Sequence, residues 1–88
     1  MLEPDLLRCF VAVAENRSFS EAGRQLGISQ PTVSQRVRRL EEQTGRSLIA
    51  RDTHSVALTD GGEAMLAFAR RTLAVLDEAQ AYFSGPAE

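Results

Sequence analysis

The chain has 88 residues, 43% of them hydrophobic and 25% charged, with a formal net charge of −2. This length suits one domain with a single modest core and excludes a second core. No apolar run is long enough to cross a bilayer, and the acidic first residues do not fit the positive region of a signal peptide. Cys9 is the only cysteine, which excludes an intramolecular disulfide and a cysteine zinc site. We therefore expect a cytoplasmic protein with no membrane partner, no cofactor and no bound metal.

Charge is unevenly distributed along the chain. Residues 17–51 hold seven arginines and three acids, whereas the remaining positions hold three arginines and nine acids. A local basic patch, rather than the net charge, decides whether a surface attracts phosphate. The distribution therefore allows a nucleic-acid partner, and we expect the flanking acids to limit non-specific binding.

Residues 5–16 are predicted to form the first helix, with Pro4 in or before its first turn. Its apolar residues cover more than one narrow stripe, so the helix is expected to be largely buried. Cys9 lies beside that stripe. A small core thiol is favoured there over a redox sensor, because no activating partner is visible in the sequence.

A short second helix is predicted to end near residue 26. Its N-cap is either Ser20 or Ser18, and Ser18 begins a Ser-x-x-Glu capping box. Gly23 costs about 1 kcal/mol of helix propensity relative to alanine, and close approach of the next helix would explain its presence. Gly27 supplies the following turn, with a positive φ expected.

The third helix is predicted over residues 30–44, from an N-cap at Ser29 to a stop at Gly45. Its apolar residues form one inward stripe at Val33, Val37 and Leu40. Its other faces carry amide, hydroxyl and guanidinium groups, which are the groups that read base edges. With the preceding turn and short helix, this pattern indicates a helix-turn-helix, and the start of the third helix is expected to suit a phosphate.

Residues 47–51 and 55–58 are predicted to be two short strands that form a hairpin, or wing, around the polar turn 52–54. His54 in that turn is the one histidine. A solvated surface histidine is the default interpretation, and a phosphate or minor-groove contact is the alternative. A metal ligand is disfavoured, because no neighbouring ligand accompanies it.

Thr59 or Asp60 is expected to cap a last helix that runs to about residue 83 and spans about 36 Å. One stripe of this helix is apolar over its whole length. A three-helix head cannot cover such a stripe, so its outer half is expected to pair with a second copy of the chain. The residues assigned to this dimerisation stripe are Met65, Phe68, Thr72, Val75, Leu76, Ala79 and Phe83.

A series of residues along these elements has a distinctive order and spacing: Leu7, Phe10, Val13, Ala14, Ser18, Phe19, Ser20, Ala22, Leu26, Ser29, Gln30, Pro31, Val33, Ser34, Leu40, Glu41, Gly45, Leu48, Arg51, Leu58, Thr59 and Gly62. The series resembles the N-terminal DNA-binding domain of LysR-type transcriptional regulators, from about residue 3 to residue 80. The resemblance implies a mainly α fold. A winged helix-turn-helix is expected over residues 1–58, a linker or dimerisation helix over 59–83 and a tail over 84–88.

The resemblance and the polar face of the third helix together give the expected DNA contacts. Base edges are expected to be read in the major groove by Gln30, Pro31, Thr32, Ser34, Gln35 and Arg38. The DNA backbone is expected to contact Arg17, Ser20, Ser29, Arg36, Arg39, Arg51, Thr53 and His54. Gln35 stands where this family often has arginine, which favours adenine or a water-mediated contact at that step. Asp52 in the wing turn weakens the expected wing contact.

The leading hypothesis is sequence-specific binding of double-stranded DNA at an inverted repeat, by a homodimer that regulates transcription. The alternative is a winged-helix module for protein–protein assembly that acts through its last helix. The polar face of the third helix argues against it, because an interface core favours Tyr, Trp or Leu. An enzyme is disfavoured, since the sequence has no phosphate loop and no metal-ligand cluster. Family members usually continue into a larger domain, so any effector is expected to bind a C-terminal domain absent from this chain.

Overall fold

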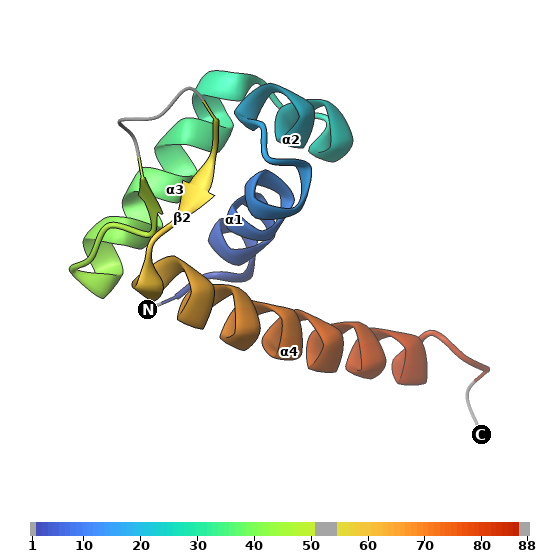
Figure 1. The fold of residues 1–88 in the computed structure, drawn as a ribbon. Coiled ribbons are helices and arrows are strands. Elements are labelled where there is room, and N and C mark those ends of the chain that lie inside the picture. The colour runs from blue at the N-terminus through green and yellow to red at the C-terminus, as the bar shows by residue number, and fades with distance from the viewer. Residues whose placement is uncertain (1, 51–54, 87–88) are drawn as a thin grey trace.

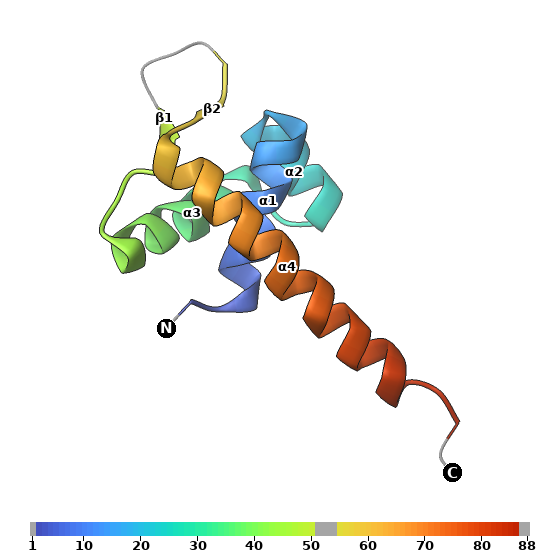
Figure 2. The ribbon, with the colours of Figure 1, turned by 60° about the horizontal axis from the view of Figure 1, so that its bottom comes forward.

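The structure, a computed structural model, describes residues 2–50 and 55–86. In chain order its elements are α1 (Pro4–Asn16), α2 (Phe19–Leu26), α3 (Gln30–Thr44), β1 (Ile49–Ala50), β2 (Ala57–Leu58) and α4 (Asp60–Phe83). Helices α1, α2 and α3 form a head, with the antiparallel β1–β2 hairpin on one side of it (Figure 1). Helix α4 crosses the head and then projects away from it, along the 54 Å long axis of the molecule (Figure 2). This arrangement confirms the predicted winged helix-turn-helix followed by a long helix.

Side-chain caps and a left-handed glycine set the ends of the helices. The hydroxyls of Ser18, Ser29 and Thr59 each accept a hydrogen bond from the backbone N–H three residues later, at 3.0, 3.3 and 3.0 Å. Ser18 is therefore the N-cap of α2, and Ser20, the other predicted cap, lies exposed within the helix. Gly27 follows α2 with a φ of 72°, in the left-handed region as predicted.

The core lies between α1 and α3, and the first half of α4 closes it. Helix α3 contributes the predicted stripe of Val33, Val37 and Leu40, each 0% exposed. Helix α4 contributes Met65 and Ala69. The sequence assigned Met65 to the dimerisation stripe, but its side chain is 8% exposed and packs in the core of its own chain. Met65 is therefore not available to a second copy.

The hairpin is shorter than predicted. Strand pairing joins residues 49–50 to residues 57–58, whereas the sequence predicted strands over 47–51 and 55–58. The backbone N–H groups at the entrance to β1 bond to a side chain of α3, which ties this segment to the head, and one further backbone bond, from the Thr59 N–H to the Leu48 carbonyl, follows the paired residues. Residues 51–54 lie outside the described part of the chain.

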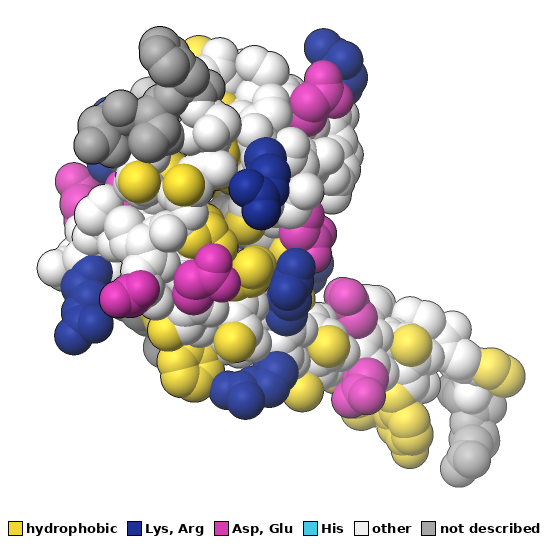
Figure 3. Space-filling model, in the orientation of Figure 1, with side chains coloured by type: hydrophobic (Ala, Val, Ile, Leu, Met, Phe, Trp, Pro, Cys, Tyr) yellow, Lys and Arg dark blue, Asp and Glu magenta, His cyan; other side chains and the backbone are white. Residues whose placement is uncertain are grey.

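The outer half of α4 exposes large apolar side chains beyond the head (Figure 3). Val75, Tyr82 and Phe83 are 60%, 79% and 80% exposed, and Phe68 in the inner half is 58% exposed. The inner half is joined to α1 by an ion pair between Glu15 and Arg70, with 3.1 Å between Oε2 and Nη2. None of the helices in the described ranges is long and apolar enough to span a membrane. Helix α4 thus presents an uncovered apolar stripe on an otherwise polar surface.

Glycine allows two close backbone contacts. A Cβ built on Gly23 would lie 2.7 Å from the backbone oxygen of Ile28, so the close approach predicted here comes from the turn before α3, with the first N–H of the helix at 3.4 Å. A Cβ built on Gly62 would overlap the carbonyl oxygen of Leu48. The start of α4 therefore lies directly against the segment that enters β1.

Gly62→Ala is expected to lower the free energy of unfolding by about 1–3 kcal/mol, because the added methyl group forces apart two packed backbone segments. Urea unfolding followed by circular dichroism measures this change. Gly61→Ala is the matched control, since a Cβ there would meet only ordinary contacts at 3.6 Å or more. The control should be neutral or stabilising by up to about 1 kcal/mol. Equal losses in the two variants would contradict the close-contact explanation.

Candidate nucleic-acid interface

Helix α3 turns its polar face away from the core. Four of the predicted base-reading residues are exposed on it: Gln30, Pro31, Gln35 and Arg38. Thr32 and Ser34 are half-buried at its margins. Residues three and four apart share one face of a helix, so this spacing forms a continuous surface of amide, hydroxyl and guanidinium groups. The fold thus brings the predicted base-reading set together.

The start of α3 offers fewer donors to a phosphate than the sequence suggests. The N–H of Thr32 donates to Ser29 Oγ at 3.3 Å, and the N–H of Val33 donates to the Ser29 carbonyl at 3.1 Å. Pro31 has no N–H. Within the described part of the chain, only the N–H of Gln30 is left open in this turn. The helix start therefore contributes its dipole more than a set of hydrogen-bond donors.

The fold gives the arginines of α3 different surroundings. Arg38 is exposed on the polar face. Arg39 is also exposed, and its Nη2 lies 4.0 Å from Oε1 of Glu3. Arg36 is half-buried, and its Nη1 approaches the Cys9 sulfur at 4.0 Å, so its guanidinium turns towards α1. A DNA contact by Arg36 requires that side chain to turn outward, whereas Arg38 and Arg39 are already at the surface.

The Cys9 thiol belongs to the core. Its residue is 1% exposed, and burial raises the pKa of the thiol, although the Arg36 guanidinium acts in the opposite direction. The thiol therefore stays protonated near neutral pH, and the thiolate is the reactive form of cysteine. This environment fits the predicted core thiol rather than a redox sensor.

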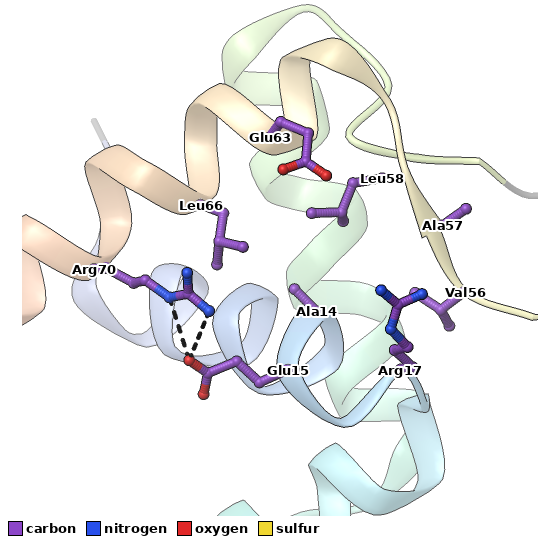
Figure 4. A pocket seen from close by; sticks show the side chains of 9 residues that line it. All are labelled: Ala14, Glu15, Arg17, Val56, Ala57, Leu58, Glu63, Leu66 and Arg70. Carbon is purple, nitrogen blue, oxygen red and sulfur yellow. Dashed lines mark hydrogen bonds and ion pairs between the residues drawn. The ribbon is translucent and has the colours of Figure 1, made fainter.

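A pocket of about 570 Å³ lies between the end of α1, β2 and the start of α4 (Figure 4). Arg17 lies on its wall beside Val56, and the ion pair of Glu15 with Arg70 lies across from it (Figure 4). Arg17 has a φ of 51°, in the left-handed region that a residue with a Cβ seldom adopts. The structure thus places this predicted backbone contact beside the hairpin.

The remaining predicted backbone contacts divide into two groups. Ser20 and Ser29 are exposed at the starts of α2 and α3. Arg51, Thr53 and His54 lie outside the described residues. In the ranges that are described, no group of histidine, cysteine, aspartate and glutamate side chains is placed to hold a metal ion.

Glu41 ties the hairpin to α3, a role that the sequence did not reveal. Its Oε2 accepts hydrogen bonds from the backbone N–H groups of Leu48 at 2.8 Å and Ile49 at 3.2 Å. Adjacent acids on a helix normally face solvent, as Glu42 does here, whereas Glu41 is half-buried. Two signals were available in the sequence: its position directly after Leu40, at the edge of the core stripe, and its place in the series that resembles the family. Through Glu41 the hairpin takes its position from the same helix that carries the polar face.

The sequence matches the profile of the family described as "Bacterial regulatory helix-turn-helix protein, lysR family" over residues 4–63. It is similar to the HTH-type transcriptional regulator BudR of Klebsiella aerogenes, with 49% identity over 78 residues, which cover 89% of this chain and 54% of that protein. It is also 47% identical over 77 residues to the HTH-type transcriptional activator AllS of Klebsiella pneumoniae, covering 88% of this chain and 28% of that protein. The chain thus spans about half the length of the first relative and about a quarter of the second.

Solved structures share the fold over nearly the whole chain. A complex of the BenM DNA-binding domain with catB site 1 DNA is 34% identical with a TM-score of 0.89, covering 94% of this chain and 92% of that chain. A complex of the CbnR DNA-binding domain with DNA is 31% identical with a TM-score of 0.86, covering 94% and 95%. OxyR of Corynebacterium glutamicum is 37% identical with a TM-score of 0.92, covering 98% of this chain and 28% of that chain. The likeness therefore includes the head, the hairpin and the long helix.

Glu41→Gln is expected to lower the free energy of unfolding by about 1–2 kcal/mol, because a neutral amide replaces the charged acceptor of two backbone N–H groups. Chemical denaturation measures the loss, and amide hydrogen exchange at Leu48 and Ile49 should become faster. Glu42→Gln makes the same chemical change at an exposed neighbour and should stay within about 0.5 kcal/mol of the unsubstituted chain. The assigned role of Glu41 fails if the two variants are equally stable.

Proposed function

Because the chain belongs to the lysR family of bacterial regulatory helix-turn-helix proteins, we propose that it binds double-stranded DNA sequence-specifically and regulates transcription. The observation that carries this proposal is the exposed polar face of α3 above its fully buried apolar stripe. A helix with one buried apolar stripe and one exposed polar face, on a small head with a flanking hairpin, suits the major groove. The similar domains of BenM and CbnR form complexes with DNA.

Base readout comes from the exposed face of α3. Gln30 and Gln35 present side-chain amides, which match the donor and acceptor edge of adenine. Arg38 presents a guanidinium, which matches the two acceptors of guanine, and Ser34 adapts to either base. Because the buried stripe holds α3 in one orientation, these groups are presented together and need little rearrangement before they meet DNA.

Backbone contacts surround this face. Arg39 serves the side of α3 next to α1, and Arg17 serves the side next to the hairpin. Ser20 adds a hydroxyl at the start of α2. Arg36 can contact the DNA backbone only after its guanidinium turns away from Cys9. Arg51 is proposed to add a backbone contact from the wing. These contacts set affinity and register, while the base contacts set the sequence.

The regulator acts as a homodimer that joins two chains through α4. Support comes from the large apolar side chains that the head leaves uncovered, which would otherwise face water. Two heads related by a two-fold axis read an inverted repeat, with half-sites about one helical turn apart or a multiple of it. With Met65 removed from the stripe and Tyr82 added, the proposed interface residues are Phe68, Thr72, Val75, Leu76, Ala79, Tyr82 and Phe83.

We propose that the chain is non-catalytic and works in the cytoplasm with the DNA that it reads. Its relatives BudR and AllS are named as a transcriptional regulator and a transcriptional activator. The one cysteine of the chain is buried and protonated, so its thiol is not a ready nucleophile.

Gln30→Ala is expected to weaken binding to a duplex selected from a random library by about 1–3 kcal/mol and to change binding to random duplexes little. Arg39→Gln should weaken binding to both duplexes alike and reduce the slope of log K against log salt by about one unit. Fluorescence anisotropy at several salt concentrations separates the two patterns. If Gln30→Ala weakens selected and random DNA equally, α3 does not read bases through this residue.

Val75→Glu is expected to convert the dimer to a monomer without unfolding the head, because it places a charge in the middle of the apolar stripe of α4. Sedimentation equilibrium measures the mass, and circular dichroism checks the fold. Ala74→Glu is the matched control, since it adds the same charge one residue away, on an exposed face off the stripe. A dimer that survives Val75→Glu, or that is lost equally in Ala74→Glu, would exclude this interface.

A further inference from the structure

The first turn of α1 brings acidic side chains beside α3. Glu3 and Asp5 line a pocket of about 350 Å³ whose remaining wall is formed largely by α3. Both acids lie outside residues 17–51, which hold most of the arginines, yet the fold places them beside the arginines of α3. The α3 residues on this pocket are Thr32, Gln35, Arg36 and Arg39.

In this pocket Glu3 meets Arg39. Its Oε1 lies 4.0 Å from Nη2 of Arg39, and the two side chains are 55% and 64% exposed. An ion pair this exposed is weak and exchanges readily with other partners. Glu3 occupies the N-cap position of α1, but its side chain makes no capping hydrogen bond there. Its carboxylate is therefore positioned to act on Arg39 and is not required to begin the helix.

We infer that Glu3 competes with DNA phosphate for Arg39 and thereby weakens the sequence-independent part of DNA binding. A carboxylate and a phosphate present similar oxygen acceptors, so an Arg39 guanidinium held towards Glu3 is less available to a phosphate. This inference rests on the proposed function. It gives Glu3 a role in setting affinity, although the residue makes no contact with a base.

The competition is effective because few other guanidinium groups are open on the side of α3 next to α1. Arg36 turns towards Cys9 and Arg38 lies on the polar face, so Arg39 is the α3 guanidinium most open to a phosphate on this side. A phosphate held by Arg39 would also lie within one Debye length of the Glu3 carboxylate, about 10 Å at 0.1 M salt, and would be repelled by it. Both effects act on every DNA sequence, and both fade as salt rises.

Glu3→Gln tests the inference with little change in side-chain shape. Binding is measured by fluorescence anisotropy on a random duplex of about 30 base pairs and on a library-selected duplex, at about 50 mM and about 300 mM salt. We expect Glu3→Gln to bind both duplexes about two- to fivefold more tightly at the lower salt, with a smaller gain at the higher salt. Glu78→Gln makes the same change in net charge on the exposed outer part of α4 and should leave the affinity unchanged.

A double-substitution cycle assigns the effect to Arg39. In an Arg39→Gln background, Glu3→Gln should give no gain, because the arginine for which carboxylate and phosphate compete is absent. The inference is overturned if Glu3→Gln equals the unsubstituted chain, if Glu78→Gln gives the same gain, or if the gain persists without Arg39. In each of these cases the proposed function is still supported if the unsubstituted chain binds DNA. An unsubstituted chain that binds neither duplex removes the proposed function, and the inference with it.

Discussion

Val33, Val37 and Leu40 are completely buried where α3 packs on α1, and this contact sets the rotation of α3 about its own axis. A turn of the helix by one residue would swing the buried stripe about 100° towards water and carry polar side chains into the core. The exposed face is therefore as well determined as the core. Gln30 and Arg38 reach solvent together because the opposite side of the helix has one favourable partner.

Helix α3 also positions the hairpin and, through the hairpin, the start of α4. The carboxylate of Glu41 binds the backbone at the entrance to β1, and the carbonyl of Leu48 in that segment lies against Gly62 in the first turn of α4. Thr59, the cap of α4, is also bonded to this segment, through its N–H to Leu48 and its hydroxyl to Ser47. The hairpin and the long helix thus share one junction, and a change there is expected to move the wing and the proposed dimer helix together.

Local sequence chemistry was sufficient for most of the fold and for the polar, exposed face of α3. Ser29 caps α3 in the structure as predicted, and the spacing of the apolar stripe correctly left the amides of Gln30 and Gln35 outside the core. Spacing could not reveal Met65 as a core residue, because the stripe of α4 is apolar on both its covered and its uncovered halves. Nor could it reveal the bond between Glu41 and the hairpin, since that bond joins backbone and side chain seven and eight positions apart across a turn.

Caps, glycines and apolar periodicity act over a few residues, so the amino-acid sequence alone predicted which segments are helices and which face of α3 is polar. It left the caps of α2 and α4 as alternatives, which the structure assigns to Ser18 and Thr59. Which side chains the arginines of α3 contact depends on the folded chain. Counted along the chain, residues 17–51 form a basic window and Glu3 lies far outside it. In the folded chain, α1 and α3 pack side by side, so Glu3 meets Arg39 and Arg36 turns towards Cys9. Electrostatic interactions depend on distance through space, which chain order does not give.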